Sequence, residues 1–110
     1  MKITSQDDTL RVSDLRELDE RTAGELIPEL RAALRPEHST IEFDLTLLRA
    51  CETETVDALL SIYDEFDREG ASFGWRLLNP PSELRQLFEL VRLHHFFEIT
   101  PPRPPRMILL

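Results

Sequence analysis

The spacing of apolar residues constrains this fold most, because it changes along the chain between every second residue and every third or fourth. A period of two is typical of a strand with one buried face, and a period of 3.6 is typical of a helix with one apolar stripe. Segments of the two kinds that alternate favour parallel strands joined by right-handed helical crossovers. The sequence therefore predicts an α/β fold in which one sheet packs against helices.

Four segments are expected to be strands, over residues 9–14, 39–45, 73–78 and 96–99. Ile3 indicates a further strand before these, with residues 6–8 as the turn that follows it. In the second of the four segments, Ile41, Phe43 and Leu45 share one face and are expected to point into the core. The prediction is a mixed sheet of four or five strands.

Three stripes of apolar residues at helical spacing predict three helices, with the stripes over residues 23–34, 56–66 and 84–91. Thr22 followed by Glu25 is typical of a capping box at a helix start, and Pro36 is expected to end the first helix. Pro28 conflicts with this helix because it removes a backbone hydrogen bond. The helix therefore begins near residues 24–26, or it is kinked.

A length of 110 residues suits a single domain, which we expect to span residues 1–99. The tail from residue 100 to residue 110 contains half of the eight prolines, favours polyproline II and ends in four apolar residues. Two roles of the tail stay open. Its apolar end packs on its own domain or on a second copy of the chain, or the tail docks in a groove of a partner.

The chain is acidic, with 13 Lys and Arg residues against 21 Asp and Glu residues, and its arginines are scattered. Such a surface repels phosphate backbones, so nucleic-acid binding is not expected. No stretch approaches the roughly 20 apolar residues of a membrane span, and the first residues do not resemble a secretory signal. The single cysteine, Cys51, fits a reducing compartment, so the predicted location is cytoplasmic.

Catalytic activity, a metal and a cofactor are not expected. His94 and His95 are adjacent and point in different directions, which makes them poor ligands for one metal. The three glycines are isolated, so they form no phosphate-binding loop. Cys51 is expected to be a buried small apolar side chain, and Tyr63 and Trp75 are expected to pack in the core.

Five short motifs follow one another along the chain: Glu17-Leu18-Asp19 before Thr22-Ala23, Glu42-Phe43-Asp44-Leu45, Gly70, Asn79-Pro80 and Phe97-Glu98-Ile99. In this order and spacing they resemble the STAS domain family, which includes anti-sigma factor antagonists and the C-terminal domains of sulfate transporters. The resemblance runs from about Leu10 to Ile99. It implies a STAS-like fold and a bacterial, non-catalytic signal-transduction module that regulates transcription through protein contacts.

In antagonists of this family, the turn after the central strand carries an Asp-Ser-Ser-Gly-like motif. A kinase that is also the anti-sigma factor phosphorylates the second hydroxyl residue of this motif. Counting from Asp44-Leu45 without a gap, the four positions are occupied by Glu52, Thr53, Glu54 and Thr55. Glu54 therefore stands at the phosphoacceptor position, where a carboxylate cannot form a stable phosphate ester.

Three interpretations of this turn stay open. Thr53 is a typical N-cap, and Glu54 and Asp57 are ordinary first-turn acids. Alternatively, Glu54 supplies a permanent negative charge where a phosphate of about −1.5 to −2 would lie, and it holds the domain in a partly phospho-like state. In the third interpretation, Thr53 or Thr55 is phosphorylated.

The resemblance implies a partner-binding surface that consists of Asp19, Glu52, Thr53, Glu54, Thr55 and Asn79. Its implied partner is a serine-kinase anti-sigma factor. Two other roles stay open, namely an accessory subunit of a phospholipid-transport ABC system and a self-assembling signalling scaffold. A homodimer is also left open.

Overall fold

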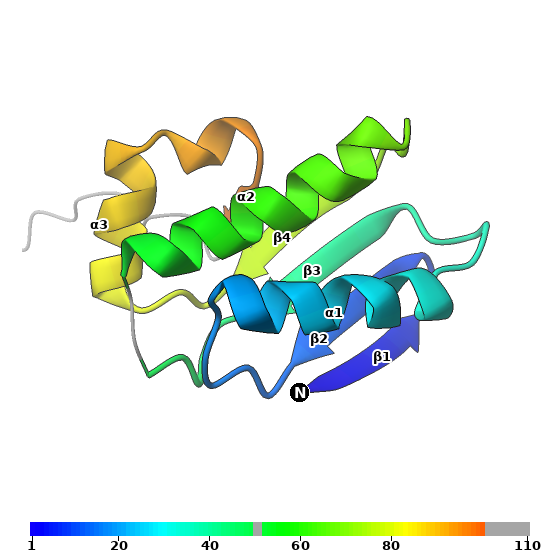
Figure 1. The fold of residues 1–110 in the computed structure, drawn as a ribbon, viewed down its shortest axis with the longest axis horizontal. Coiled ribbons are helices and arrows are strands. Elements are labelled where there is room, and N and C mark those ends of the chain that lie inside the picture. Colours follow the sequence, from blue (N-terminus) through cyan, green and yellow to red (C-terminus); the bar gives the residue numbers. More distant parts are fainter. Residues whose placement is uncertain (50–51, 101–110) are drawn as a thin grey trace, which may run out of the picture.

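The computed structural model describes residues 1–49 and 52–100 of the chain. Cys51, the side chain of His94 and residues 101–110 of the tail lie outside the described part, and so do the predictions made for them. The elements are β1 (Lys2–Gln6), β2 (Thr9–Ser13), α1 (Glu20–Ala33), β3 (Thr40–Asp44), α2 (Thr53–Arg68), β4 (Gly74–Leu78), α3 (Ser82–Leu90), the 3-10 helix η1 (Leu93–His95) and β5 (Glu98–Thr100) (Figure 1).

The five strands form one sheet in the order β1-β2-β3-β4-β5. β1 and β2 form an antiparallel hairpin, while β2, β3, β4 and β5 are parallel neighbours. Successive right-handed crossovers that always step to the next strand in the same direction leave their helices on one face of the sheet. Figure 1 shows α1 and α2 side by side across this face. The predicted mixed sheet packed against three helices is confirmed.

The core lies between the sheet and the helices. Ile41, Phe43 and Leu45 are fully buried, as the alternation in β3 predicts. The helices contribute the predicted apolar stripes, whose buried members include Ala23, Leu26 and Leu30 from α1, Val56, Leu59 and Ile62 from α2, and Leu84 and Phe88 from α3. Each large aliphatic side chain buried in this way stabilises the fold by roughly 1.5–3 kcal/mol.

The N-caps of α1 and α2 differ from the predictions. α1 begins at Glu20 with Asp19 as its N-cap, so the predicted capping box of Thr22 and Glu25 is wrong. The Asp19 carboxylate accepts hydrogen bonds from the backbone N–H of Thr22 at 2.9 Å and from its hydroxyl at 3.0 Å. A capping oxygen is therefore already in place one turn before the expected start. In α2 the N-cap is Glu52, one residue before the predicted Thr53.

Pro28 lies inside α1, which begins well before residues 24–26, so a helix start near those residues is wrong. A proline in this position cannot donate a hydrogen bond to the carbonyl of Gly24. Pro28 and Gly24 are both exposed, which leaves that carbonyl open to water. Leu26 and Leu30 are fully buried on the opposite side, and their packing holds the helix together.

The end of α2 agrees with the prediction, whereas the start of β5 differs from it because local hydrogen bonds extend the preceding 3-10 turn. Gly70 ends α2 as predicted, with a φ of 79° that suits glycine. The predicted strand over residues 96–99 begins only at Glu98. The backbone N–H groups of Phe96 and Phe97 both donate to the carbonyl of Leu93, at 2.9 and 3.0 Å, so these two residues continue the 3-10 turn.

Candidate functional site

The N-termini of α1 and α2 lie at the same edge of the sheet, because the parallel strands β2 and β3 that precede them end there. Two surface hollows of about 430 and 260 Å³ lie between these helix starts. Asp19 and Glu54 line both hollows, so side chains that are 35 positions apart in the sequence share one surface. We call the lining of the two hollows, together with Thr53, the helix-start surface.

Asp19 is fixed in place by its role as N-cap of α1. Two hydrogen bonds from Thr22 stabilise its ionised form, and the pKa of the Asp19 carboxyl is therefore lower than its ordinary value. The carboxylate is held at the helix start, where the helix dipole also favours negative charge. Asp19 thus presents a fixed negative charge to the helix-start surface.

Glu52 and Thr55 close the start of α2 as a capping box. The backbone N–H of Glu52 donates to Oγ1 of Thr55 at 3.4 Å, and the N–H of Thr55 donates to the carbonyl oxygen of Glu52 at 3.0 Å. Thr55 is only 2% exposed, whereas Thr53, the first residue of α2, is exposed. Of the two threonine hydroxyls, the folded domain therefore presents that of Thr53 to the solvent.

Glu54 is the second residue of α2, and its side chain is exposed. The helix-start surface around it is strongly acidic: its hollows are lined by Glu17, Asp19, Glu20, Glu52, Glu54 and Asp57, against the two arginines Arg21 and Arg49. A surface of this kind attracts a basic partner and repels an acidic one.

Asn79 lies at the same edge of the sheet but is not part of the lining of either hollow. It follows β4 with a φ of 52°, a left-handed conformation that asparagine adopts more readily than most residues. Its backbone N–H donates to the carbonyl of Thr100 at 2.7 Å. The structure thus brings four of the predicted site residues together, namely Asp19, Glu52, Glu54 and Thr55, with Thr53 next to them.

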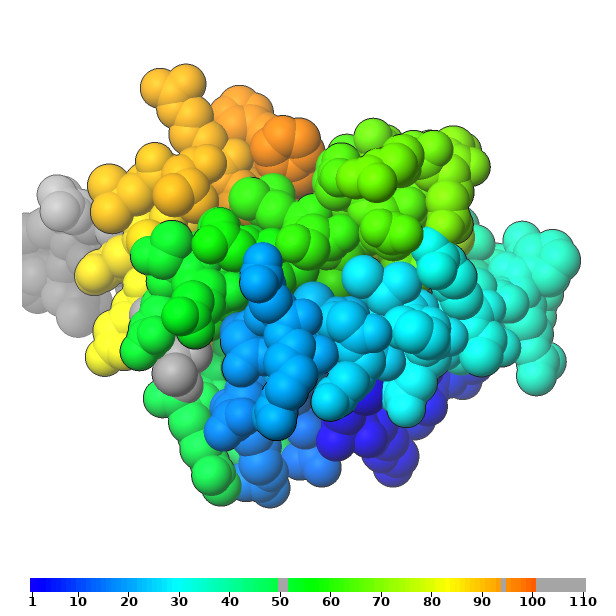
Figure 2. Space-filling view, in the orientation of Figure 1, coloured from blue at the N-terminus to red at the C-terminus, as the bar shows by residue number. Residues whose placement is uncertain are grey.

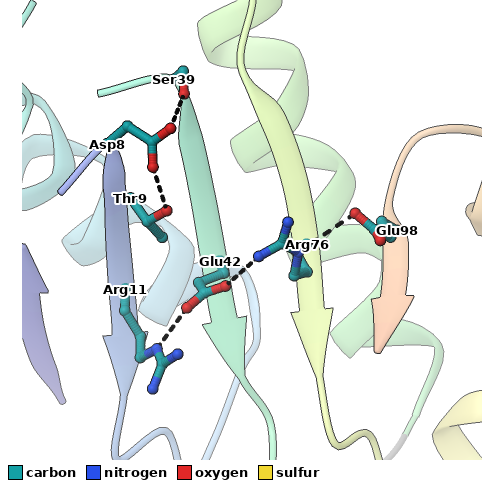
Figure 3. Close-up of polar contacts among 7 residues, drawn as sticks. All are labelled: Asp8, Thr9, Arg11, Ser39, Glu42, Arg76 and Glu98. Atoms are coloured by element: carbon teal, nitrogen blue, oxygen red, sulfur yellow. Dashed lines mark hydrogen bonds and ion pairs between the residues drawn. The ribbon is translucent and has the colours of Figure 1, made fainter. Parts of the chain in front are cut away.

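The opposite, helix-free face of the sheet carries a row of charges that sequence reasoning missed (Figure 3). Strand pairing places Arg11, Glu42, Arg76 and Glu98 side by side on β2, β3, β4 and β5. Glu42 is 3% exposed and accepts hydrogen bonds from Arg11 at 2.6 Å and from Arg76 at 3.1 Å. Arg76 also lies 3.4 Å from Glu98. We call these four residues the charge row.

Electrostatics within the charge row favour the charged form of Arg76. Partial desolvation lowers the pKa of Arg76, but its hydrogen bonds with Glu42 and Glu98 outweigh this effect, so its pKa is raised overall. The alternation of apolar and polar residues in each strand is enough to predict that these side chains lie on the face away from the core. Only the pairing of strands could show that they form one row, because the register depends on residues far apart in the sequence.

Within residues 1–49 and 52–100, no helix is long and apolar enough to cross a membrane. In the same part of the chain, no three His, Cys, Asp or Glu side chains are grouped so that they could hold a metal ion.

Comparison with known proteins gives both a family and a fold. The family model described as "Mlab, STAS domain" matches residues 1–101. A crystal structure of TM1081 from Thermotoga maritima, described as a candidate anti-sigma factor antagonist, superposes with a TM-score of 0.69 at 14% identity, covering 89% of this chain and 83% of that chain.

An NMR structure of TM1081 superposes with a TM-score of 0.68 at 14% identity, covering 88% of this chain and 77% of that chain. At this identity the two structures show a shared fold and no more. A search of curated proteins finds no significant match. Because the family model spans all the described residues, this protein belongs to the STAS domain family.

Proposed function

We propose that this protein is a non-catalytic regulatory module that acts as an anti-sigma factor antagonist. In this proposal the helix-start surface binds a kinase-like anti-sigma factor in the bacterial cytoplasm. The observation that carries the proposal is the position of Glu54, an exposed carboxylate in the first turn of α2 that lines both hollows with Asp19. This is the turn in which antagonists of the family carry their phosphoacceptor.

Glu54 takes the place of the phosphoserine switch in this proposal. The unpaired N–H groups and the dipole of a helix N-terminus favour negative charge. A phosphate there carries a charge of about −1.5 to −2, and a glutamate supplies about half of it without a kinase. The surface is therefore permanently charged, and its contact with the partner does not depend on phosphorylation.

The test is affinity capture from the native lysate with three tagged baits: the wild-type chain, Glu54→Ser and Glu83→Ser. Glu83 is the matched control, because it is an exposed acid in the first turn of α3. The expected result is that a kinase-like anti-sigma factor co-purifies and that only Glu54→Ser changes the amount retained. Equal retention by all three baits would show that Glu54 is only a first-turn acid of α2.

A second candidate function is that of an accessory subunit of a phospholipid-transport ABC system, and the exposed hydroxyl of Thr53 in this turn is compatible with it. Capture of an ABC ATPase in place of an anti-sigma factor would favour this candidate. Particles of high mass in light scattering would favour the self-assembling scaffold.

A further inference from the structure

A further hollow lies at the other end of α2, away from the helix-start surface. It has a volume of about 250 Å³ and lies between the end of α2, the loop after it and the start of β4; its lining residues are Tyr63, Asp67, Gly70, Ala71, Ser72, Phe73 and Trp75. We call it the aromatic hollow. Tyr63 and Trp75 were expected to pack in the core. The structure buries Trp75 there and packs the partly buried Tyr63 against the core, and both also contribute to this lining.

The aromatic side chains around this hollow form a continuous strip. The ring centroids of Phe96 and Tyr63 are 5.3 Å apart, those of Tyr63 and Trp75 are 5.7 Å apart, and those of Phe73 and Trp75 are 6.2 Å apart. Phe96 is 48% exposed, which is unusual for so large an apolar ring. Figure 2 shows the segment around residue 95 (orange) against the surface of α2 (green).

Asp67 adds a negative charge to the aromatic lining. Its side chain is exposed, and it makes no ion pair within the part of the chain that the structure describes. Nearby acids on the same helix already have arginine partners: Asp64 pairs with Arg68, and Glu65 pairs with Arg31. The aromatic hollow therefore combines the partly exposed rings of Tyr63 and Phe73 with the carboxylate of Asp67, which is free to accept a guanidinium group.

This combination fits a proline-rich peptide that carries arginine. Polyproline II segments dock in aromatic-lined grooves, because the extended helix is already formed and costs little entropy to bind. Arginine adds a charge-assisted hydrogen bond to a carboxylate and stacks on aromatic rings. The chain itself contains such a segment, Pro-Pro-Arg-Pro-Pro-Arg, at residues 101–106. We propose that the aromatic hollow binds residues 101–106 of a second copy of this chain.

The direction of β5 favours a second copy over the same chain. Thr100, the last residue of β5, pairs with Leu78 at the end of β4, whereas the aromatic hollow lies beside the first residues of β4. From the sequence, the prolines at positions 101, 102, 104 and 105 are expected to favour extended conformations for themselves and for the residues before them. A polyproline II segment of six residues is about 19 Å long and does not reverse direction. The same segment of a second copy does not need to reverse direction to reach the hollow.

The direct test uses Trp75, the single tryptophan of the chain, as a fluorescent probe inside the hollow. A peptide with the sequence of residues 100–110 is titrated into the full chain, into Asp67→Lys and into Asp64→Lys. Asp64 is the matched control, because it is an exposed acid on α2 outside the lining. We expect saturable binding to the wild type and to Asp64→Lys, and binding at least about tenfold weaker to Asp67→Lys.

A peptide with glutamate at both arginine positions should not bind. If this peptide binds equally well, if Asp67→Lys binds as tightly as Asp64→Lys, or if no saturable change occurs, the hollow does not recognise the segment.

The second measurement is sedimentation equilibrium of the full chain over a wide concentration range. We expect an average mass that rises with concentration, and that returns to the monomer in Arg103→Glu/Arg106→Glu. A chain that stays monomeric at every concentration, or that associates equally with both arginines reversed, would overturn the proposal of a second copy. The outcome is independent of the anti-sigma proposal, because the helix-start surface lies at the opposite end of α2.

Discussion

Nε of Arg11 lies 2.6 Å from Oε1 of Glu42, a carboxylate that is 3% exposed although it faces away from the helix-covered core. Arg76 approaches the other oxygen of the same carboxylate at 3.1 Å. Three strands are thus joined through one side chain on the helix-free face (Figure 3). This buried charge is compensated on both sides, which is the condition under which a carboxylate is tolerated in such a place.

Replacing this carboxylate is expected to weaken the sheet. Glu42→Gln keeps the shape of the side chain but removes the counter-charge of Arg11 and leaves Arg76 with Glu98 as its only acidic partner in the charge row. We expect a loss of about 1–2 kcal/mol in the free energy of unfolding, because both arginines are partly exposed and solvent screens them. Urea denaturation measures the loss. Glu98→Gln, at the exposed end of the charge row, should cost less than about 0.5 kcal/mol, and equal losses in the two variants would contradict this account.

Asp19 makes the stability depend on pH. Its pKa is lowered in the folded protein, so its contribution is complete above the unfolded-state pKa of about 3.9 and is lost as the pH falls through the folded value. Asp19→Asn keeps a capping oxygen but has no charge. We expect its melting temperature to lie below that of the wild type at neutral pH, with a difference that shrinks below about pH 4. A difference that is constant over this range in calorimetry would be inconsistent with the ionised cap.

His38 joins the first hairpin to the loop before β3. Its ring is 5% exposed, Nε2 lies 2.7 Å from the hydroxyl oxygen of Ser5, and Nδ1 accepts from the backbone N–H of Arg35 at 3.0 Å. His38→Leu leaves that N–H without an acceptor, so we expect a loss of about 1–3 kcal/mol. Ser5→Ala should cost less, because Ser5 is exposed. Urea unfolding of the two variants compares them, and an equal cost would show that the Arg35 contact contributes nothing.

Replacing each of the two threonines at the start of α2 should change the stability of the protein by a different amount. Thr55→Val removes the hydroxyl that accepts from the N–H of Glu52, and we expect a loss of about 1 kcal/mol. Thr53→Val changes an exposed first-turn residue and should stay within about 0.5 kcal/mol of the wild type. Thermal unfolding followed by circular dichroism compares the two variants. A melting temperature of Thr53→Val that is equal to or lower than that of Thr55→Val would contradict this prediction.

The order of the elements could be read from the sequence because it depends on local patterns. Alternation placed Ile41 and Phe43 in the core, and helical spacing placed Leu26 and Leu59 there, each from a short window of residues. The helix starts were predicted less well. Asp19, Thr22, Glu52 and Thr53 are all near helix ends and have capping groups, so local propensity alone could not choose among them.

The candidate site was predicted only in part, again because local sequence patterns do not decide where a helix begins. The neighbourhood of Asp19 and Glu54 followed from the family resemblance, and both residues line the two hollows. The opposite exposures of Thr53 and Thr55 could not be foreseen, because they depend on where α2 begins. Asn79 was grouped with the site from its place in the family pattern, yet it contributes to neither hollow.

The sequence by itself determined the alternation of strands and helices, the apolar faces and the acidic surface, since each depends on residues that are close in the chain. Only the tertiary structure decided the charge row and the aromatic hollow. Arg11 and Glu42 meet through strand register, and Tyr63 meets Phe96 through the packing of α2 against the turn after η1. Such contacts join residues that are more than 30 positions apart, where no local pattern specifies which partners meet.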